Sequence, residues 1–204
     1  MDALILVDIQ PDFLPGGALA VPDGNAIIPV VNQLVTHFDL VVATQDWHPS
    51  GHGSFASAHK GKQPFEAIDL YGLHQVLWPD HCVQGSAGAA LSDAINWDKI
   101  AAIFRKGMNP GIDSYSGFYD NGYRKRTGLD GYLKALGVQR VFVAGLAADY
   151  CVYYTAKDAL KEGFDTVLIE DATRPIDASN FKEAKADLKS KGASIMYSSE
   201  LLGR

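Results

Sequence analysis

The sequence predicts an α/β fold, a three-layer sandwich in which helices cover both faces of a mostly parallel six-stranded sheet. Short runs rich in Val, Ile and Leu alternate along the 204 residues with longer stretches of helical periodicity. Such short apolar runs are typical of parallel strands that are buried on both faces. Because parallel strands are joined by right-handed crossovers, this alternation places helices on both faces of one sheet. We expect a single domain over residues 1-204.

The strands and helices can be placed along the chain from their periodicity and their ends. The predicted strands are residues 3–7, 40–44, 100–105, 141–145, 166–169 and 193–197. In the first predicted helix, the residues that share one face are Ile27, Val30, Val31, Leu34 and Val35. The other predicted helices are residues 128–136, the stretch from Cys151 to Gly163, and residues 181–191. These three helices stop at residues that suit a left-handed C-cap, namely Gly137, Gly163 and Gly192.

Residues 46–84 do not follow this alternation. The segment is rich in His, Gly and Pro, and a loop of this length inside a compact domain is usually either functional or disordered. Its aromatic residues argue against disorder, and they include Trp47, Phe55, Phe65, Tyr71 and Trp78. We therefore expect a lid or one wall of a binding site.

The composition excludes several classes of protein. A hydrophobic content of 47% and a charged content of 21% are typical of a soluble globular protein, and no segment approaches the roughly 20 apolar residues of a membrane span. A net charge of -6 and one short basic cluster, Arg124-Lys125-Arg126, argue against binding to nucleic acid or a membrane. With no targeting signal and two cysteines, the chain is expected in the cytoplasm with reduced thiols. The expected partner is a small molecule, and a homo-oligomer is left open.

Residues that can carry chemistry follow four of the predicted strands. The first strand ends at Asp8, the second leads to Asp46 and His48, the third to Lys106, and the fourth to Cys151. In an open parallel sheet, ligands bind outside the carboxyl ends of the strands. We therefore expect a carboxylate, a metal-binding pair, an ammonium group and a thiol to meet at one edge of the sheet.

Asp8, Lys106 and Cys151 could form a nucleophilic triad. A thiol at a helix N-terminus and beside an ammonium group is stabilised as a thiolate, and Asp8 could take its proton and return it to a leaving amine. Each residue also has an ordinary explanation. Cys151 could pack in the core, Asp8 could form a turn or cap a helix, and Lys106 could extend to the surface.

Asp46, His48 and His81 could bind one metal ion. Alternate residues of an extended segment point the same way, so Asp46 and His48 can bind together, while His81 lies at the far end of the aromatic segment. Two imidazoles and one carboxylate suit a divalent Zn, Fe or Mn ion with positions left open for water or substrate. The alternative is an ordinary loop with satisfied polar residues. His52 is a further candidate ligand, and Cys82 is expected to pack.

Seven short motifs occur in an order that is specific to one family: DIQPDF, TQDWHP, HGSF, WPDHCV, KG, SYSGF and GLAADYCV. With these motifs the chain resembles, from about Leu4 to Thr173, the nicotinamidases and pyrazinamidases of the isochorismatase-like cysteine hydrolase family. The resemblance implies an isochorismatase-like fold. It also implies metal-dependent hydrolysis of nicotinamide to nicotinate and ammonia, a step of NAD salvage, with pyrazinamide as a further substrate.

The resemblance also assigns roles to individual residues. The positions that match the family's catalytic triad, followed by those that match its metal ligands, are Asp8, Lys106 and Cys151, and Asp46, His48 and His81. In this family the metal binds the pyridine nitrogen of the substrate. The backbone N–H groups of Ala147 and Cys151 are expected to form an oxyanion hole, with a cis peptide between Leu146 and Ala147. The aromatic residues at the ring-binding positions are Phe13, Trp78 and Tyr115.

The chain departs from the family at Ala148, where many members have threonine, and at Tyr150, where some have histidine. His52 also lies closer to Asp46 than the extra histidine ligand of certain members. Two other functions compete with the one that the resemblance implies. The first is another isochorismatase-like amidase with the same triad, although isochorismatase-type enzymes lack the metal ligands. The second is a non-catalytic protein that binds a metal or a small ligand, for example a redox sensor built on Cys151.

Overall fold

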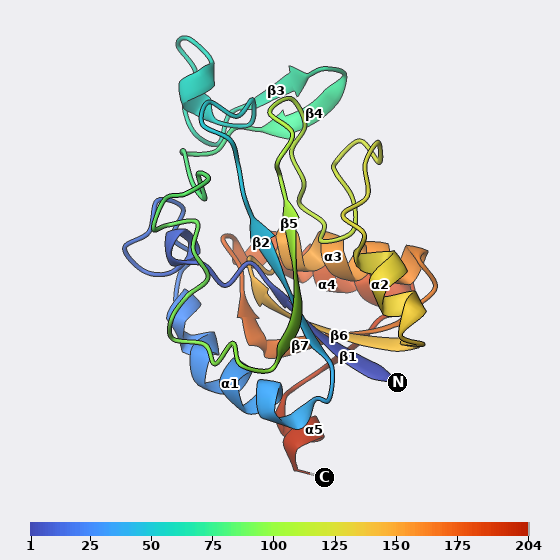
Figure 1. The fold of residues 1–204 in the computed structure, drawn as a ribbon. Coiled ribbons are helices and arrows are strands. Elements are labelled where there is room, and N and C mark those ends of the chain that lie inside the picture. Colours follow the sequence, from blue (N-terminus) through green and yellow to red (C-terminus); the bar gives the residue numbers. More distant parts are fainter. Residues whose placement is uncertain (204) are drawn as a thin grey trace.

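Six strands form the central sheet, and every neighbouring pair in it is parallel. The computed structural model describes residues 1–203, and its strand order is β5-β2-β1-β6-β7-β8 (Figure 1). The strands of this sheet are β1 (Asp2–Val7), β2 (Val41–Asp46), β5 (Ile100–Lys106), β6 (Arg140–Leu146), β7 (Asp165–Arg174) and β8 (Ser194–Met196). All six predicted strands are confirmed. Only β7 differs by more than two residues at an end, because it continues past the predicted 166–169.

Helices cover both faces of the sheet, which confirms the three-layer sandwich. Residues of α1 (Ile28–His37) and α5 (Ser199–Leu202) pack on one face, and the sequence pattern did not indicate α5. On the other face lie α2 (Leu129–Ala135), α3 (Cys151–Lys161) and α4 (Ala178–Ser190). Among the described residues, none of the helices combines the length and the apolar character that crossing a membrane requires.

The place of each strand in the sheet explains its pattern of residues. In the central strand β1, Leu4 and Leu6 face one core while Ile5 and Val7 face the other, so every position after Asp2 is apolar. β5 lies at the edge of the sheet, where Ile103 is 50% exposed. The expectation that residues 100–105 form a fully buried strand was therefore wrong. An edge strand has a neighbour on one side only, so part of its surface stays exposed. In β5 the last residue, Lys106, is nevertheless buried.

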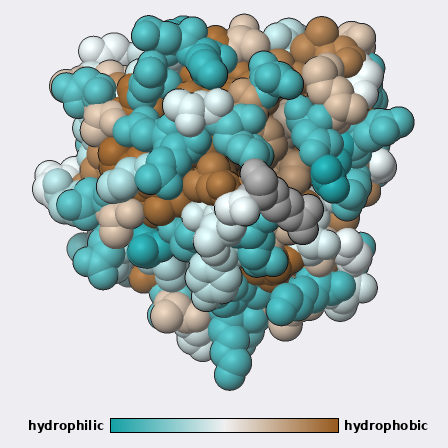
Figure 2. All heavy atoms as spheres, turned by 90° about the horizontal axis from the view of Figure 1, so that it is seen from below, coloured by the Kyte–Doolittle hydropathy of each residue, from teal (hydrophilic) through white to brown (hydrophobic). Residues whose placement is uncertain are grey.

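Residues 46–84 lie beyond the carboxyl ends of β2 and β5 (Figure 1). They include an antiparallel hairpin that does not pair with the main sheet, which the sequence pattern did not indicate. The hairpin strands and the three 3-10 helices of the chain are β3 (Ala67–Leu70), β4 (Leu73–Val76), η1 (Pro11–Phe13), η2 (Gly24–Ile27) and η3 (Ala56–Ala58). Figure 2 shows the opposite end of the molecule, where hydrophilic side chains are interspersed with apolar ones. The predicted site residues lie at the hairpin end.

Gly145 marks a close approach between β6 and β1. Its φ is +121°, and an added Cβ atom would lie 2.1 Å from the carbonyl oxygen of Val7. The register of β6 against β7 also shifts here, and Thr173 Oγ1 donates a hydrogen bond to the carbonyl oxygen of Gly145 at 2.7 Å. We expect Gly145→Ala to lower the free energy of unfolding by about 4 kcal/mol, because the backbone clash adds to an unfavourable φ. Urea denaturation followed by circular dichroism measures this change.

Gly163→Ala is the matched control for this prediction. Gly163 also has a positive φ, of +88°, but an added Cβ atom would meet nothing within 4 Å. Its substitution should cost about 1 to 2 kcal/mol, from the left-handed backbone alone. Equal losses in the two variants would contradict a role for the close approach to Val7.

Candidate active site

The carboxyl ends of four strands bring the predicted reactive side chains to one edge of the sheet. Asp8 directly follows β1, Asp46 and Lys106 are the last residues of β2 and β5, and Cys151 begins α3 soon after β6. In the parallel pairing of β2 with β5, Asp46 and Lys106 are direct partners. Their side chains therefore lie next to each other because of the sheet register, although the two residues are 60 positions apart.

The ammonium group of Lys106 is the centre of the site. Its Nζ lies 2.8 Å from Asp8 Oδ2, 3.0 Å from Asp46 Oδ1 and 3.4 Å from Cys151 Sγ, and it donates a hydrogen bond to the carbonyl oxygen of Ser114 at 2.8 Å. Burial alone would lower the pKa of Lys106, but the Asp46 and Asp8 carboxylates raise that pKa well above its usual value. Lys106 is therefore a buried cation, which excludes the alternative of a surface lysine.

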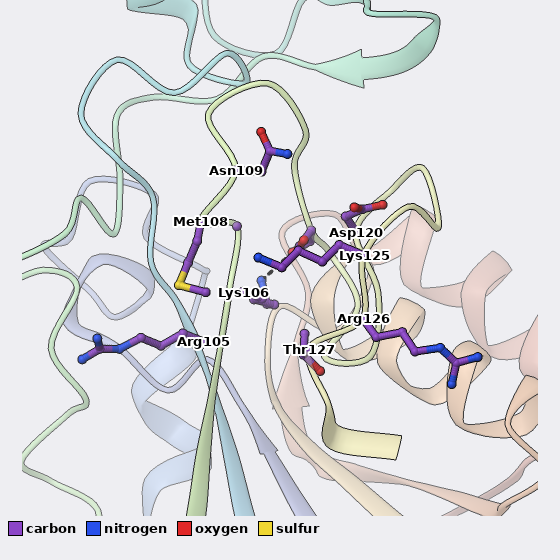
Figure 3. A pocket seen from close by; sticks show the side chains of 10 residues that line it. Arg105, Lys106, Met108, Asn109, Asp120, Lys125, Arg126 and Thr127 are labelled. Carbon is purple, nitrogen blue, oxygen red and sulfur yellow. Dashed lines mark hydrogen bonds between the residues drawn. The ribbon is translucent and has the colours of Figure 1, made fainter. Parts of the chain in front are cut away.

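A cavity of about 450 Å³, separate from the aromatic cavity described below, is lined in part by Lys106. Figure 3 shows that the side chains of Arg105 and Arg126 point away from it and that Lys125 points across it. Arg105 stacks on Trp47. Both arginines are therefore engaged in contacts outside this cavity. Of the predicted triad, Lys106 alone lines it.

The two carboxylate oxygens of Asp8 have different surroundings. Oδ1 accepts a hydrogen bond from Thr44 Oγ1 at 2.6 Å. Oδ2 lies in the ion pair with Lys106 and accepts no well-aligned hydrogen bond among the described residues. Burial raises the pKa of Asp8, although the Lys106 ammonium opposes that rise. A carboxyl group with a raised pKa is a better proton acceptor near neutral pH than an ordinary aspartate.

Cys151 is 7% exposed, and it is the first residue of α3. Burial raises the pKa of its thiol well above the usual value; Lys106 lowers this pKa, and Asp8 and Asp46 raise it. This differs from the expectation of a thiolate stabilised by the helix end and the ammonium group. Desolvation and two carboxylates outweigh one cation, so the resting group is a thiol beside a base.

The turn before Cys151 leaves two backbone donors free. The peptide between Leu146 and Ala147 is cis, as the resemblance implies. Among residues 1–203, the N–H groups of Ala147 and Cys151 have no hydrogen-bond acceptor, whereas that of Ala148 donates to Arg174 O at 2.8 Å. Ala147 and Cys151 both line the aromatic cavity described below. Two free N–H groups at a cavity wall can stabilise an oxyanion.

Three potential metal ligands meet beside Lys106. Asp46 Oδ2 lies 2.9 Å from His48 Nε2 and 3.4 Å from His81 Nε2, and the three ligand atoms lie within 4.8 Å of one another. The Nδ1 atom of each histidine faces a carbonyl oxygen, that of Gly107 at 3.0 Å and that of Pro79 at 2.7 Å. A carbonyl only accepts hydrogen bonds, so Nδ1 carries the hydrogen and Nε2 keeps its lone pair for a metal. This donor set fits a divalent metal ion.

Several residues that hold the metal ligands in place were not identified from the sequence. The Gln10 side chain binds the backbone of Asp46 on both sides, because Oε1 accepts from Asp46 N at 2.8 Å and Nε2 donates to Asp46 O at 2.9 Å. A Cβ atom at Gly107 would lie 2.5 Å from the His48 ring, which explains the glycine of the KG motif. His52 is not in the ligand group. Its two ring nitrogens contact the hydroxyl of Ser54 and the carbonyl oxygen of Asn109 instead.

Asp149, next to the thiol in sequence, stabilises the turn. Its carboxylate accepts hydrogen bonds from the backbone N–H groups of Ile176 and Asp177, each at 2.9 Å. These two hydrogen bonds connect the segment before α3 to the segment before α4. The sequence around Asp149 did not indicate Ile176 or Asp177 as its partners.

An aromatic cavity of about 320 Å³ lies against Cys151 and two of the potential metal ligands. The residues that line it are Phe13, Leu19, Asp46, Trp78, His81, Tyr115, Ala147, Tyr150, Cys151 and Ile176. The three predicted ring-binding residues are among them, and Trp78 Nε1 donates a hydrogen bond to Tyr115 OH at 3.2 Å. Leu19, Ile176 and Tyr150 were not predicted; for Tyr150, the one signal was its place before Cys151. Apolar walls around a few polar groups suit a small aromatic ligand.

Comparisons with known proteins point to one family. The family model described as the isochorismatase domain matches residues 2–200. The nicotinamidase of Escherichia coli is 46% identical over 199 residues, covering 95% of this chain and 93% of the relative. The nicotinamidase of Acinetobacter baylyi is 47% identical over 201 residues, covering 98% and 94%.

Solved structures resemble the whole fold as well. The nicotinamidase pyrazinamidase of Acinetobacter baumanii is 47% identical with a TM-score of 0.96, covering 98% of this chain and 97% of the other. The PnC1 protein of L. infantum in complex with nicotinate is 42% identical with a TM-score of 0.87, covering 98% and 93%. The pyrazinamidase of Pyrococcus horikoshii in complex with zinc is 39% identical with a TM-score of 0.81, covering 96% and 98%.

Proposed function

The chain belongs to the isochorismatase family, and we propose that it is a nicotinamidase, a cysteine amidohydrolase that converts nicotinamide to nicotinate and ammonia in NAD salvage. Relatives that are 46% and 47% identical over nearly the whole chain are nicotinamidases. The observation that carries the proposal is the position of Lys106 Nζ. It contacts Asp8, Asp46 and Cys151 at once, and so joins a base, a metal ligand and a thiol beside one aromatic cavity.

In the proposed reaction, Asp8 Oδ2 takes the proton of the Cys151 thiol as the sulfur attacks the carboxamide carbon of the substrate. The N–H groups of Ala147 and Cys151 stabilise the negative charge that develops on the carboxamide oxygen, at about 3 kcal/mol per donor. Lys106 remains protonated and holds Asp8 and the sulfur in reach of each other. Asp8 then gives the proton to the leaving nitrogen, so that the C–N bond breaks, ammonia departs and a thioester remains.

The second half of the reaction hydrolyses the thioester. Asp8 takes a proton from a water molecule as its oxygen attacks the thioester carbon. The C–S bond then breaks, Asp8 returns that proton to the sulfur to restore the Cys151 thiol, and the acid leaves and ionises to nicotinate. A divalent ion held by Asp46, His48 and His81 supplies a Lewis acid to which the ring nitrogen of the substrate can bind. Phe13, Trp78 and Tyr115 are proposed to hold the flat ring in the cavity.

Ammonia release from nicotinamide by the purified protein tests the proposal. It is measured as isolated, after chelation, and after the return of Zn, Fe(II) or Mn, with pyrazinamide as a second substrate. We expect release that chelation removes and that at least one of these ions restores. A cytoplasmic location is part of the proposal, and the two free cysteines fit a reducing compartment.

Each outcome of this measurement has a definite meaning. If protein shown to be metal-free releases ammonia at the undiminished rate, the amidase activity is supported and the metal has no role in the mechanism. No release by metal-loaded protein would refute the nicotinamidase proposal. Assays with other amides would then separate another amidase from a non-catalytic binding protein.

A further inference from the structure

We propose that Thr44 is a positioning residue whose hydroxyl makes Oδ2 of Asp8 the oxygen that takes the proton of Cys151. The inference rests on the proposed function. Thr44 lies in the TQDWHP motif, but it touches neither the aromatic cavity nor the sulfur and acts only through Asp8.

The hydroxyl of Thr44 binds Asp8 at two points. Its oxygen accepts the backbone N–H of Asp8 at 3.2 Å, and its single hydrogen is donated to Asp8 Oδ1 at 2.6 Å. Asp8 has just left β1 and has a φ of +47°, so no ladder partner holds it at this point. One hydroxyl thus fixes both the backbone and the carboxylate of the residue, and Thr44 itself is fully buried.

The rotamer of Thr44 is held by the segment that carries the SYSGF motif. A Cβ atom at Gly117 would lie 2.7 Å from Thr44 Cγ2, so the glycine backbone lies directly over the methyl group. The N–H of Gly117 donates in turn to Thr155 Oγ1 at 2.9 Å, and Thr155 lies on α3, the helix that begins with Cys151. The methyl group is confined on this side, which leaves the hydroxyl facing Asp8.

The consequence is that the two oxygens of the Asp8 carboxylate are not equivalent. Oδ1 is engaged by the short hydrogen bond from Thr44 at 2.6 Å. Oδ2 is thereby directed at Lys106 Nζ, 2.8 Å away, the group that also contacts Cys151 Sγ. Without the hydroxyl, the carboxylate could rotate and present either oxygen to Lys106, and the proton transfer would lose its fixed geometry.

Thr44→Val keeps the shape of the side chain and removes the hydroxyl, whereas Thr44→Ser keeps the hydroxyl and removes the methyl group. We expect kcat for nicotinamide to fall about 30-fold in Thr44→Val, the size expected for a lost hydrogen bond to a charged group, with KM changed less than about threefold. Thr44→Ser should keep kcat within about threefold of the unmodified protein. Thr44→Ala is a second variant without the hydroxyl, in case Thr44→Val does not fold.

A second readout does not depend on the substrate. The rate at which iodoacetamide alkylates Cys151 reports how readily its proton is removed, and peptide mass spectrometry separates Cys151 from Cys82. This rate should fall in Thr44→Val and Thr44→Ala and be retained in Thr44→Ser. Thr166→Val is the matched control, because it removes a buried threonine hydroxyl that binds the carbonyl oxygen of Phe164 and contacts neither Asp8 nor Gly117. It should lower the melting temperature and leave the alkylation rate unchanged.

The two readouts separate failure of this inference from failure of the proposed function. If the unmodified protein releases no ammonia but alkylation still falls in the two variants without the hydroxyl and in no other, the inference stands and the nicotinamidase proposal fails. Alkylation and kcat in Thr44→Val equal to those of the unmodified protein would overturn the inference. Losses in Thr44→Ser or Thr166→Val as large as in Thr44→Val would overturn it too, since they would indicate a structural role only.

Discussion

Cys151→Ala is expected to abolish ammonia release from nicotinamide, with a loss in kcat of about 10,000-fold or more. The sulfur supplies the bond that replaces the C–N bond of the substrate, and no other described residue can offer that atom, because Cys82 lies elsewhere in the core. Removing the nucleophile of a triad typically costs as much as removing the whole triad. The measurement is ammonia release by the variant at enzyme concentrations high enough to detect slow turnover.

The metal content of Cys151→Ala should equal that of the unmodified protein, because Cys151 is not among the three residues that bring ligand atoms together. Cys82→Ser is the matched control. Cys82 is a second buried, free cysteine, and its thiol has no role in the proposed reaction. It should keep kcat within a few-fold. Retained turnover in Cys151→Ala would remove Cys151 from the mechanism.

His81→Ala should lower the bound metal and reduce kcat/KM for nicotinamide by about 100-fold or more. The variant loses one of three protein ligands, and a site with two ligands binds a divalent ion far more weakly. The effect should be smaller at high metal concentration, because mass action refills a weakened site. Elemental analysis of the dialysed protein gives the metal content, and ammonia release against added metal gives the recovery.

His59→Ala provides the control on the same segment. The His59 ring binds the carbonyl oxygen of Gly53 at 2.7 Å and lies outside the ligand group. Its loss should change stability modestly and leave the metal content intact. A normal metal content in His81→Ala would rule out His81 as a ligand, and activity equal to that of the unmodified protein would rule out a role in turnover.

The strands, the helices and the order of the motifs could be predicted because their signals are local. Apolar runs mark β1 and β6, which are buried on both faces, and glycines mark helix ends such as Gly163, where φ is +88°. Asp8 and Cys151 were found because each stands where an apolar run ends. The hairpin β3–β4 was missed because its four-residue strands are too short for a clear alternation and too exposed for an apolar run.

The sequence alone determined the fold class, the six strands and the set of residues that meet at the carboxyl edge of the sheet, because periodicity and motif spacing are properties of neighbouring residues. Only the tertiary structure decided the edge position of β5, the direction of the pKa shift of Cys151 and the contact between Asp8 and Thr44. The first depends on which strands pair, and the second on desolvation by residues from several elements. The third joins residues 36 positions apart. Burial and long-range pairing both arise only when distant parts of the chain fold against one another.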